Sequence, residues 1–154
     1  MGTARYAIRP SSSEDGERAV AIWRAAVEAT HDFLPPEDLA AIDAEVREFL
    51  PQMPLWLAVD DADRPIAFML LDDGHLEALF IDPAHAGSGV GRTLVAHALQ
   101  LHPALTTDVN EQNPAALAFY EHLGFQRTGR SELDGQGRPF PLIHLRYQQV
   151  LASG

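Results

Sequence analysis

A loop with three alternating glycines constrains the fold of this chain more than any other feature. The loop is Gly87-Ser88-Gly89-Val90-Gly91-Arg92. An apolar, strand-like run over 76–81 precedes it, and a run with apolar residues at helical spacing follows over about 91–101. Glycines where a strand passes into a helix leave backbone N–H groups uncovered, and the helix N-terminus directs them at a bound anion. The unit predicts an α/β protein that binds a pyrophosphate.

Three classes of nucleotide ligand compete for such a loop. A P-loop needs Lys and then Ser or Thr after its last glycine, whereas Arg92 and Thr93 follow Gly91 here. The dinucleotide fingerprint needs a glycine where Arg92 stands, and it normally follows an early strand with an acidic residue about twenty positions later. Coenzyme A fits both the loop and its late place in the chain.

The rest of the chain alternates between helical and strand-like patterns. Helices are expected over about 14–30, with Ser13 as the cap, and over 36–50, 91–101 and 114–123. Strands are expected over 6–9, 55–59, 66–71, 76–81, 105–109, 125–133 and 141–147. Asn113 is expected to cap the last helix and Gly124 to end it. The pattern predicts a mixed fold with about four helices.

Composition and charge exclude several kinds of protein. The 154 residues predict one domain, 1–154, with a core of about 5–148. The absence of cysteine excludes disulfides, thiolate zinc sites and cysteine nucleophiles. A formal charge of -11 at pH 7 argues against nucleic acid and anionic membranes as partners. Because no apolar run approaches the roughly 20 residues that span a bilayer, and none resembles a signal peptide, we expect a cytoplasmic protein.

Seven histidines raise the question of a metal site. No pair of them has a recognised ligand spacing with a third ligand, so we expect no metal. Five are expected at the surface or at interfaces, namely His85, His97, His102, His122 and His144.

Two motifs carry a resemblance to a known family. The segment 86–91 resembles the Gln/Arg-x-x-Gly-x-Gly/Ala loop of the Gcn5-related N-acetyltransferase (GNAT) superfamily, with Ala86 in place of the usual Gln or Arg. The segment 113–125 resembles that family's Asn-x-x-Ala-x-x-Phe-Tyr-x-x-x-Gly-Phe pattern. The segments 29–34, 79–83 and 109–113 are similar to a YjaB-like bacterial subgroup described as peptidyl-lysine acetyltransferases. The resemblance extends over nearly the whole chain.

The resemblance implies a fold and a cofactor site. It implies a mixed, mostly antiparallel central sheet flanked by about four helices, with acetyl-CoA in a cleft between the fourth and fifth strands. It implies that the backbone of the fourth strand lies along the pantetheine arm, that the loop holds the pyrophosphate, and that Asn113 contacts the pantetheine. The implied cofactor-binding residues are Leu79, Phe80, Ile81, Ala86, Gly87, Ser88, Gly89, Val90, Gly91, Arg92 and Asn113. It is compatible with a monomer or a homodimer.

Acetyl transfer to an amine needs a base and an acid. A free lysine amine has a pKa near 10.4, so only about one part in a few thousand is neutral at pH 7. The resemblance places general bases on the strand before the loop, which makes Glu77 the first candidate; His75 shares its face, and a water chain is a further alternative. Tyr120 matches the family tyrosine that donates a proton to the coenzyme A sulfur.

The sequence predicts the acceptor-binding residues and the overall activity less narrowly than the cofactor site. The acceptor is expected to contact His31, Asp32 and Phe33, between the first two helices, and the hairpin around 138–140, with Glu28 as another anionic group.

The leading hypothesis is acetyl-CoA-dependent acetylation of a primary amine, a protein lysine among the candidates. The alternative is an acyl-CoA-binding sensor without catalysis, which the absence of Gln or Arg at Ala86 favours. Acylation of a hydroxyl, or use of a longer acyl chain, also stays open.

Overall fold

The computed structural model describes residues 6–30, 36–134 and 137–148. The chain forms two compact units. The first, which we call the N-terminal unit, comprises Met1–Leu71 and Ala78–His97. The second, the C-terminal unit, comprises Asp72–Glu77 and Ala98–Gly154. The expectation of one domain over 1–154 stays a prediction.

Seven strands form the sheet. They are β1 (Ala7–Pro10), β2 (Trp56–Val59), β3 (Pro65–Asp72), β4 (His75–Ile81), β5 (Thr106–Asn110), β6 (Phe125–Ser131) and β7 (Leu142–Tyr147). Their hydrogen-bonded order is β1-β2-β3-β4-β5-β7-β6. β4 and β5 are parallel, whereas β1–β2, β2–β3, β5–β7 and β6–β7 are antiparallel. The prediction of a mixed, mostly antiparallel sheet is confirmed.

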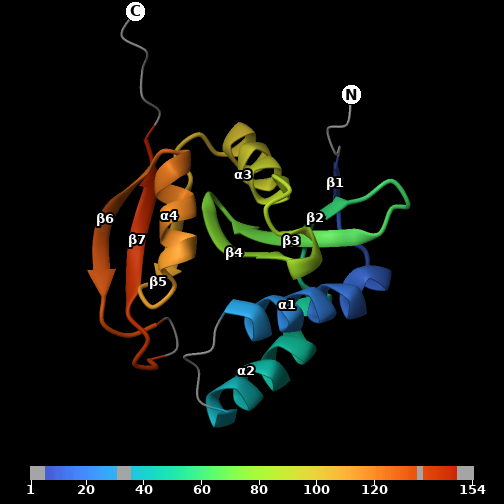
Figure 1. Ribbon diagram of the computed structural model, residues 1–154, viewed down its shortest axis with the longest axis horizontal. Helices are drawn as coiled ribbons and strands as arrows, with labels where there is room; N and C mark the ends of the chain where they lie inside the picture. Colours follow the sequence, from blue (N-terminus) through green and yellow to red (C-terminus); the bar gives the residue numbers. More distant parts are fainter. Residues whose placement is uncertain (1–5, 31–35, 135–136, 149–154) are drawn as a thin grey trace, which may run out of the picture. The chain divides into compact units, whose positions relative to one another are not determined.

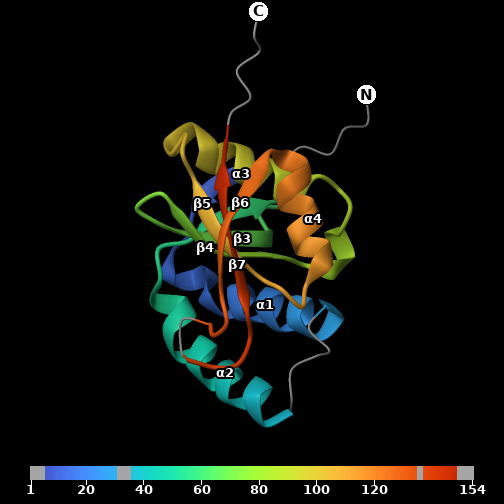
Figure 2. The same cartoon turned by 90° about the vertical axis from the view of Figure 1, so that its left-hand side faces the viewer.

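In the N-terminal unit, helices cover both faces of the strands. Figures 1 and 2 show α1 (Gly16–Thr30) and α2 (Pro36–Phe49) on one side of β3, and the start of α3 (Val90–Leu101) on the other. Ile22 of α1 is fully buried in one cluster with Leu57 and Phe68. Alternation along β2 turns Trp56 to the opposite face, where its ring lies 4.5 Å from that of His97 of α3.

In the C-terminal unit, one helix packs against a three-stranded part of the sheet. α4 (Pro114–Leu123) runs alongside β6 and β7 and packs against β5 and β6 (Figures 1 and 2). Asn113 caps α4 by accepting from the Ala116 amide at 3.2 Å, and Gly124 ends it with φ of 113°. Both predictions for these two residues are confirmed.

Alternation along the strands gives the C-terminal unit a buried face and a polar face. Thr107 and Val109 of β5, with Ile143 and Leu145 of β7, are buried. Thr106 and Asp108 therefore point to the opposite face, together with His144. We call this opposite side the polar face.

Several predicted boundaries were wrong. Ser12, not Ser13, precedes the first helical turn, because the Asp15 carboxylate accepts from the Ser12 amide at 2.8 Å and Ser13–Asp15 forms a short 3-10 turn. The strand predicted over 125–133 ends at Ser131, and a bulge between Arg127 and Gly129 shifts its register. None of the described helices is long and apolar enough to cross a membrane.

Candidate active site

The glycine loop has a backbone that only glycine adopts easily. Gly87 has φ of 78° and Gly89 has φ of 90°, both in the left-handed region. A Cβ added at either position would meet no atom within 4 Å. Packing inside the protein therefore does not explain these glycines. The geometry leaves room for a ligand to approach the backbone closely.

The start of α3 supplies unpaired amides next to this loop. α3 begins at Val90, and the first amide there with a protein acceptor is that of Thr93, which donates to the Gly89 carbonyl at 3.1 Å. Within the described residues, the amides of residues 89–92 donate to no backbone carbonyl. Ala86 and Arg92 are exposed beside them, while Val90 and Gly91 are buried. Such a helix start attracts anionic groups.

An ion pair that the sequence analysis did not anticipate anchors the residues before the loop. Arg18 of α1 donates to the Asp82 carboxylate at 2.7 Å and to the Pro65 carbonyl at 2.8 Å. The other Asp82 oxygen accepts from the Ala84 amide at 3.0 Å, so Asp82 caps this turn. The Ala84 amide and Arg18 together lower the pKa of Asp82. Nothing in the local sequence around Arg18 indicates that its partner is Asp82.

The last residues of β4 are half-buried and lead into the loop. Leu79, Phe80 and Ile81 each keep part of their surface exposed. The Phe80 ring lies 5.6 Å from that of Phe68 and packs against the N-terminal core. This packing anchors the segment to the N-terminal core through Phe80.

Tyr120 lies in a buried, aromatic environment. Its ring contacts those of Phe119 and Phe125 at 5.0 and 5.3 Å. Burial raises the pKa of Tyr120 well above its usual value, and an interaction with the Thr107 hydroxyl opposes this effect weakly. Thr107 itself donates its hydroxyl proton to the Leu76 carbonyl at 2.9 Å. Tyr120 is therefore a protonated phenol at neutral pH.

The two candidate bases differ in their hydrogen bonds. His75 and Glu77 lie two residues apart on β4 and both point to the polar face. His75 uses both ring nitrogens: Nδ1 lies 2.6 Å from Thr106 Oγ1, and Nε2 lies 3.2 Å from Asp108 Oδ2. Glu77 is exposed and makes no hydrogen bond or ion pair with the described residues. Of the two, only Glu77 has side-chain atoms without a hydrogen-bond partner among the described residues.

A network around Asp108 was missed by the sequence analysis. Asp108 pairs with His144 Nδ1 as well as with His75, and Ser131 Oγ lies 2.7 Å from His144 Nε2. His144 lies partly exposed at the surface, as expected, but the sequence did not indicate its contact with Asp108. Its alternation with Ile143 and Leu145 indicates the polar face, but not its partner. In the described ranges, no three His, Cys, Asp or Glu side chains are grouped so that they could hold a metal ion.

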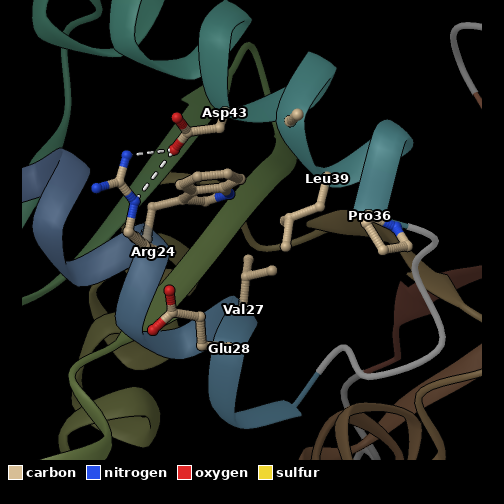
Figure 3. Close-up of a pocket in the computed structure, with 8 residues that line it drawn as sticks. Arg24, Val27, Glu28, Pro36, Leu39 and Asp43 are labelled. Atoms are coloured by element: carbon tan, nitrogen blue, oxygen red, sulfur yellow. Dashed lines mark hydrogen bonds and ion pairs between the residues drawn. The ribbon is translucent and has the colours of Figure 1, made fainter.

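A cavity of about 240 Å³ lies between α1 and α2. Figure 3 shows Val27 and Leu39 on its apolar walls, with Arg24 and Asp43 paired across the two helices. Asp43 also accepts from Arg47 at 3.0 Å, so its charge is balanced, and Glu28 adds an exposed carboxylate to the lining. His31, Asp32 and Phe33 lie outside the described residues.

Comparison with known proteins identifies the family. A family model described as acetyltransferase (GNAT) domain matches residues 21–141. Peptidyl-lysine N-acetyltransferase YjaB of Escherichia coli strain K12 is 55% identical over 140 residues, which cover 91% of this chain and 95% of that protein. The YjaB protein of Salmonella typhimurium strain LT2 is 54% identical over 140 residues, with coverage of 91% and 97%. The solution structure of apo-form YjaB from Escherichia coli matches with a TM-score of 0.89 at 54% identity, covering 93% of this chain and 97% of that one. The chain belongs to the GNAT family and is an N-acetyltransferase.

Proposed function

We propose that this enzyme transfers the acetyl group of acetyl-CoA to the side-chain amine of a protein lysine. The observation that carries the proposal is the glycine loop, where left-handed Gly87 and Gly89 lead into the unpaired amides at the start of α3. GNAT acetyltransferases use acetyl-CoA. The acceptor class comes from the two YjaB relatives, which are named peptidyl-lysine N-acetyltransferases and are more than half identical to this chain.

The residues of the loop fit the donor substrate. The pyrophosphate of acetyl-CoA would accept from the amides of residues 89–92, with Gly87 and Ser88 completing the loop and Arg92 adding a cation. The backbone of residues 79–81 would lie along the pantetheine arm. The side-chain oxygen of Asn113, Oδ1, caps α4. The N–H groups of the same side chain are therefore left to contact the pantetheine arm. Ala86 contributes no polar side chain to this set.

The chemistry is a direct attack on the thioester. Glu77 takes one proton from the acceptor ammonium, directly or through a water, gives a neutral amine, and later releases this proton to solvent. The amine nitrogen forms a bond to the acetyl carbon, the carbon–sulfur bond breaks, and the nitrogen loses its second proton to solvent. Tyr120 donates a proton to the departing sulfur and regains one from solvent. Because burial raises the pKa of Tyr120, the phenol is present in its donor form at neutral pH.

A thiol-release assay tests this proposal. Acetyl-CoA is incubated with lysine peptides, polyamines, amino acids and aminoglycosides, and binding of CoA is measured separately by calorimetry. Release of CoA that depends on lysine peptides supports the proposal, and release with another amine class changes the acceptor. Binding of CoA without release on any acceptor would favour the non-catalytic sensor. Absence of CoA binding would refute the assignment of the glycine loop.

The proposal also covers the partners, the location and the oligomeric state of the enzyme. Its partners are acetyl-CoA and a lysine-bearing protein, its location is the cytoplasm, and it acts as a monomer or a homodimer without a metal ion. Light scattering after size-exclusion chromatography decides the oligomeric state.

A further inference from the structure

The polar face of the C-terminal unit carries a carboxylate held between two imidazoles. His75 Nε2 lies 3.2 Å from Asp108 Oδ2, and His144 Nδ1 contacts the other oxygen, Oδ1. Hydroxyl groups close the two ends: Thr106 Oγ1 lies 2.6 Å from His75 Nδ1, and Ser131 Oγ lies 2.7 Å from His144 Nε2. The three central side chains come from β4, β5 and β7.

Hydrogen-bond capacity sets the direction of the two central contacts. An ionised carboxylate only accepts, so each imidazole must direct an N–H at Asp108. Each Asp108 oxygen accepts one of these hydrogen bonds and keeps a further lone-pair site unused. The Asp108 side chain is 33% exposed, so a ligand can reach these sites.

A second carboxylate follows on the neighbouring strand and points to the same face. β4 and β5 are paired at His75 with Thr106 and at Leu76 with Thr107, so Glu77 and Asp108 are the next residue on each strand. Leu76 and Thr107 are buried, which turns both carboxylates to the polar face. Arg146 of β7 is the cation on the same face, where it is paired in register with Thr106.

We propose that Asp108, positioned by His75 and His144, binds the ammonium group of the acceptor together with Glu77. This inference rests on the proposed function and specifies how it selects a charged amine. Asp108 accepts a hydrogen bond from the ammonium and holds it, and Glu77 then removes the proton. His75 and His144 are positioning residues, because their N–H groups fix the rotamer of Asp108 without contacting the acceptor.

The test compares two probes that differ in one charge. Nα-acetyl-lysine methylamide carries an ammonium, and Nα-acetyl-norleucine methylamide has a similar shape without it. Affinity for each is measured by calorimetry with CoA present. We expect the wild-type protein to prefer the lysine probe by about 10-fold, as for one charge-assisted hydrogen bond. In Asp108→Asn the preference should fall to about 3-fold or less, with CoA affinity unchanged.

Matched measurements separate this inference from folding and from overall charge. Asp61→Asn removes the charge of an exposed turn residue and should keep the full preference. In the wild-type protein, the imidazole NMR signals of His75 and His144 should shift with the lysine probe and not with the norleucine probe. Equal shifts with both probes, or an unchanged preference in Asp108→Asn, overturn the inference. If the wild-type enzyme acetylates no amine, the proposed function itself fails.

Discussion

Hydrogen bonding at single residues decides which of two neighbouring groups is available for chemistry. His75 and Glu77 lie two positions apart on one face of the strand before the glycine loop, and the sequence leaves both as candidate bases. The structure engages both ring nitrogens of His75 with Thr106 and Asp108, while Glu77 is exposed. A base must have a free lone pair within reach of its substrate. The role of base is therefore proposed for Glu77.

Tyr120→Phe tests the proton donor. We expect kcat to fall about 100-fold, as for the loss of a general acid, with little change in the KM for acetyl-CoA. The ring contacts with Phe119 and Phe125 stay, so stability should change little. Steady-state kinetics from pH 6 to about 9 measure the effect; burial raises the pKa of Tyr120, so the donor stays protonated over this range.

Tyr147→Phe is the matched control for this prediction. Tyr147 lies on β7, and its ring contacts that of Phe125 at 5.4 Å. The variant removes the same hydroxyl group from a neighbouring ring and should keep normal kcat. Full activity of Tyr120→Phe at every pH would contradict the proposed role.

The ion pair of Asp15 with Arg9 predicts how stability depends on pH. Arg9 donates to both Asp15 oxygens, at 2.9 and 3.1 Å, and lowers the pKa of this carboxyl from 3.8 to about 2. Because the folded pKa lies below the unfolded value, the stabilisation is present above about pH 4 and is lost as the pH falls toward 2.

Urea unfolding of Asp15→Asn measures this contribution. We expect the free energy of unfolding to drop by about 2 kcal/mol at pH 7, and the difference from the wild type to vanish near pH 2. Asp61→Asn, which changes an exposed carboxylate, should match the wild type. Equal stability of Asp15→Asn and wild type at pH 7 would show that the pair contributes nothing.

At the scale of elements, the junction of β4, the glycine loop and α3 is defined by backbone conformation. The left-handed glycines turn the chain, and the helix start leaves amides without protein acceptors. The sequence predicts this element because glycine spacing and helical periodicity are local signals. The anchor Arg18–Asp82 is not local, since its partners lie 64 positions apart.

Gly87→Ala tests the loop as a pyrophosphate site. Gly87 and Gly137 both have φ of 78° and both have open space around an added Cβ. Each alanine variant should lose about 1 kcal/mol of stability from the same backbone strain. Only Gly87→Ala should weaken CoA binding, by about 10-fold or more, because its methyl group occupies the space of the ligand.

Calorimetric titration with CoA and thermal unfolding of both variants provide the measurement. Equal CoA affinity in the two variants would remove the loop from the cofactor site. A loss of affinity in both would point to a general effect of strain.

At the scale of the whole molecule, ligand binding and unfolding are coupled. CoA at about 100 times its Kd should stabilise the folded chain by about 2.7 kcal/mol. For a chain of this length the shift in Tm is about 5 to 10 °C. If the two compact units unfold as the predicted single domain, calorimetry shows one transition and CoA shifts all of it. A second transition that CoA leaves unmoved would show that the units unfold separately.

The sequence by itself determined the family, the mixed α/β fold and the caps of the last helix. Local sequence patterns predict these features, namely the loop 87–92, the segment 113–125 and the periodicity of the helices. The family is confirmed by the match over residues 21–141 and by relatives more than half identical. Exact boundaries were less well predicted, because one side-chain contact of Asp15 moves the start of the first helix.

Only the tertiary structure decided which polar side chains meet. Alternation along β5 and β7 places Asp108 and His144 on one face, but their contact depends on strand register. The partners in the network lie 31 and 36 positions apart, and register is fixed by packing of the whole sheet. A shift of one residue in strand register would turn Asp108 toward the core. Local sequence patterns therefore cannot predict its contacts with His75 and His144.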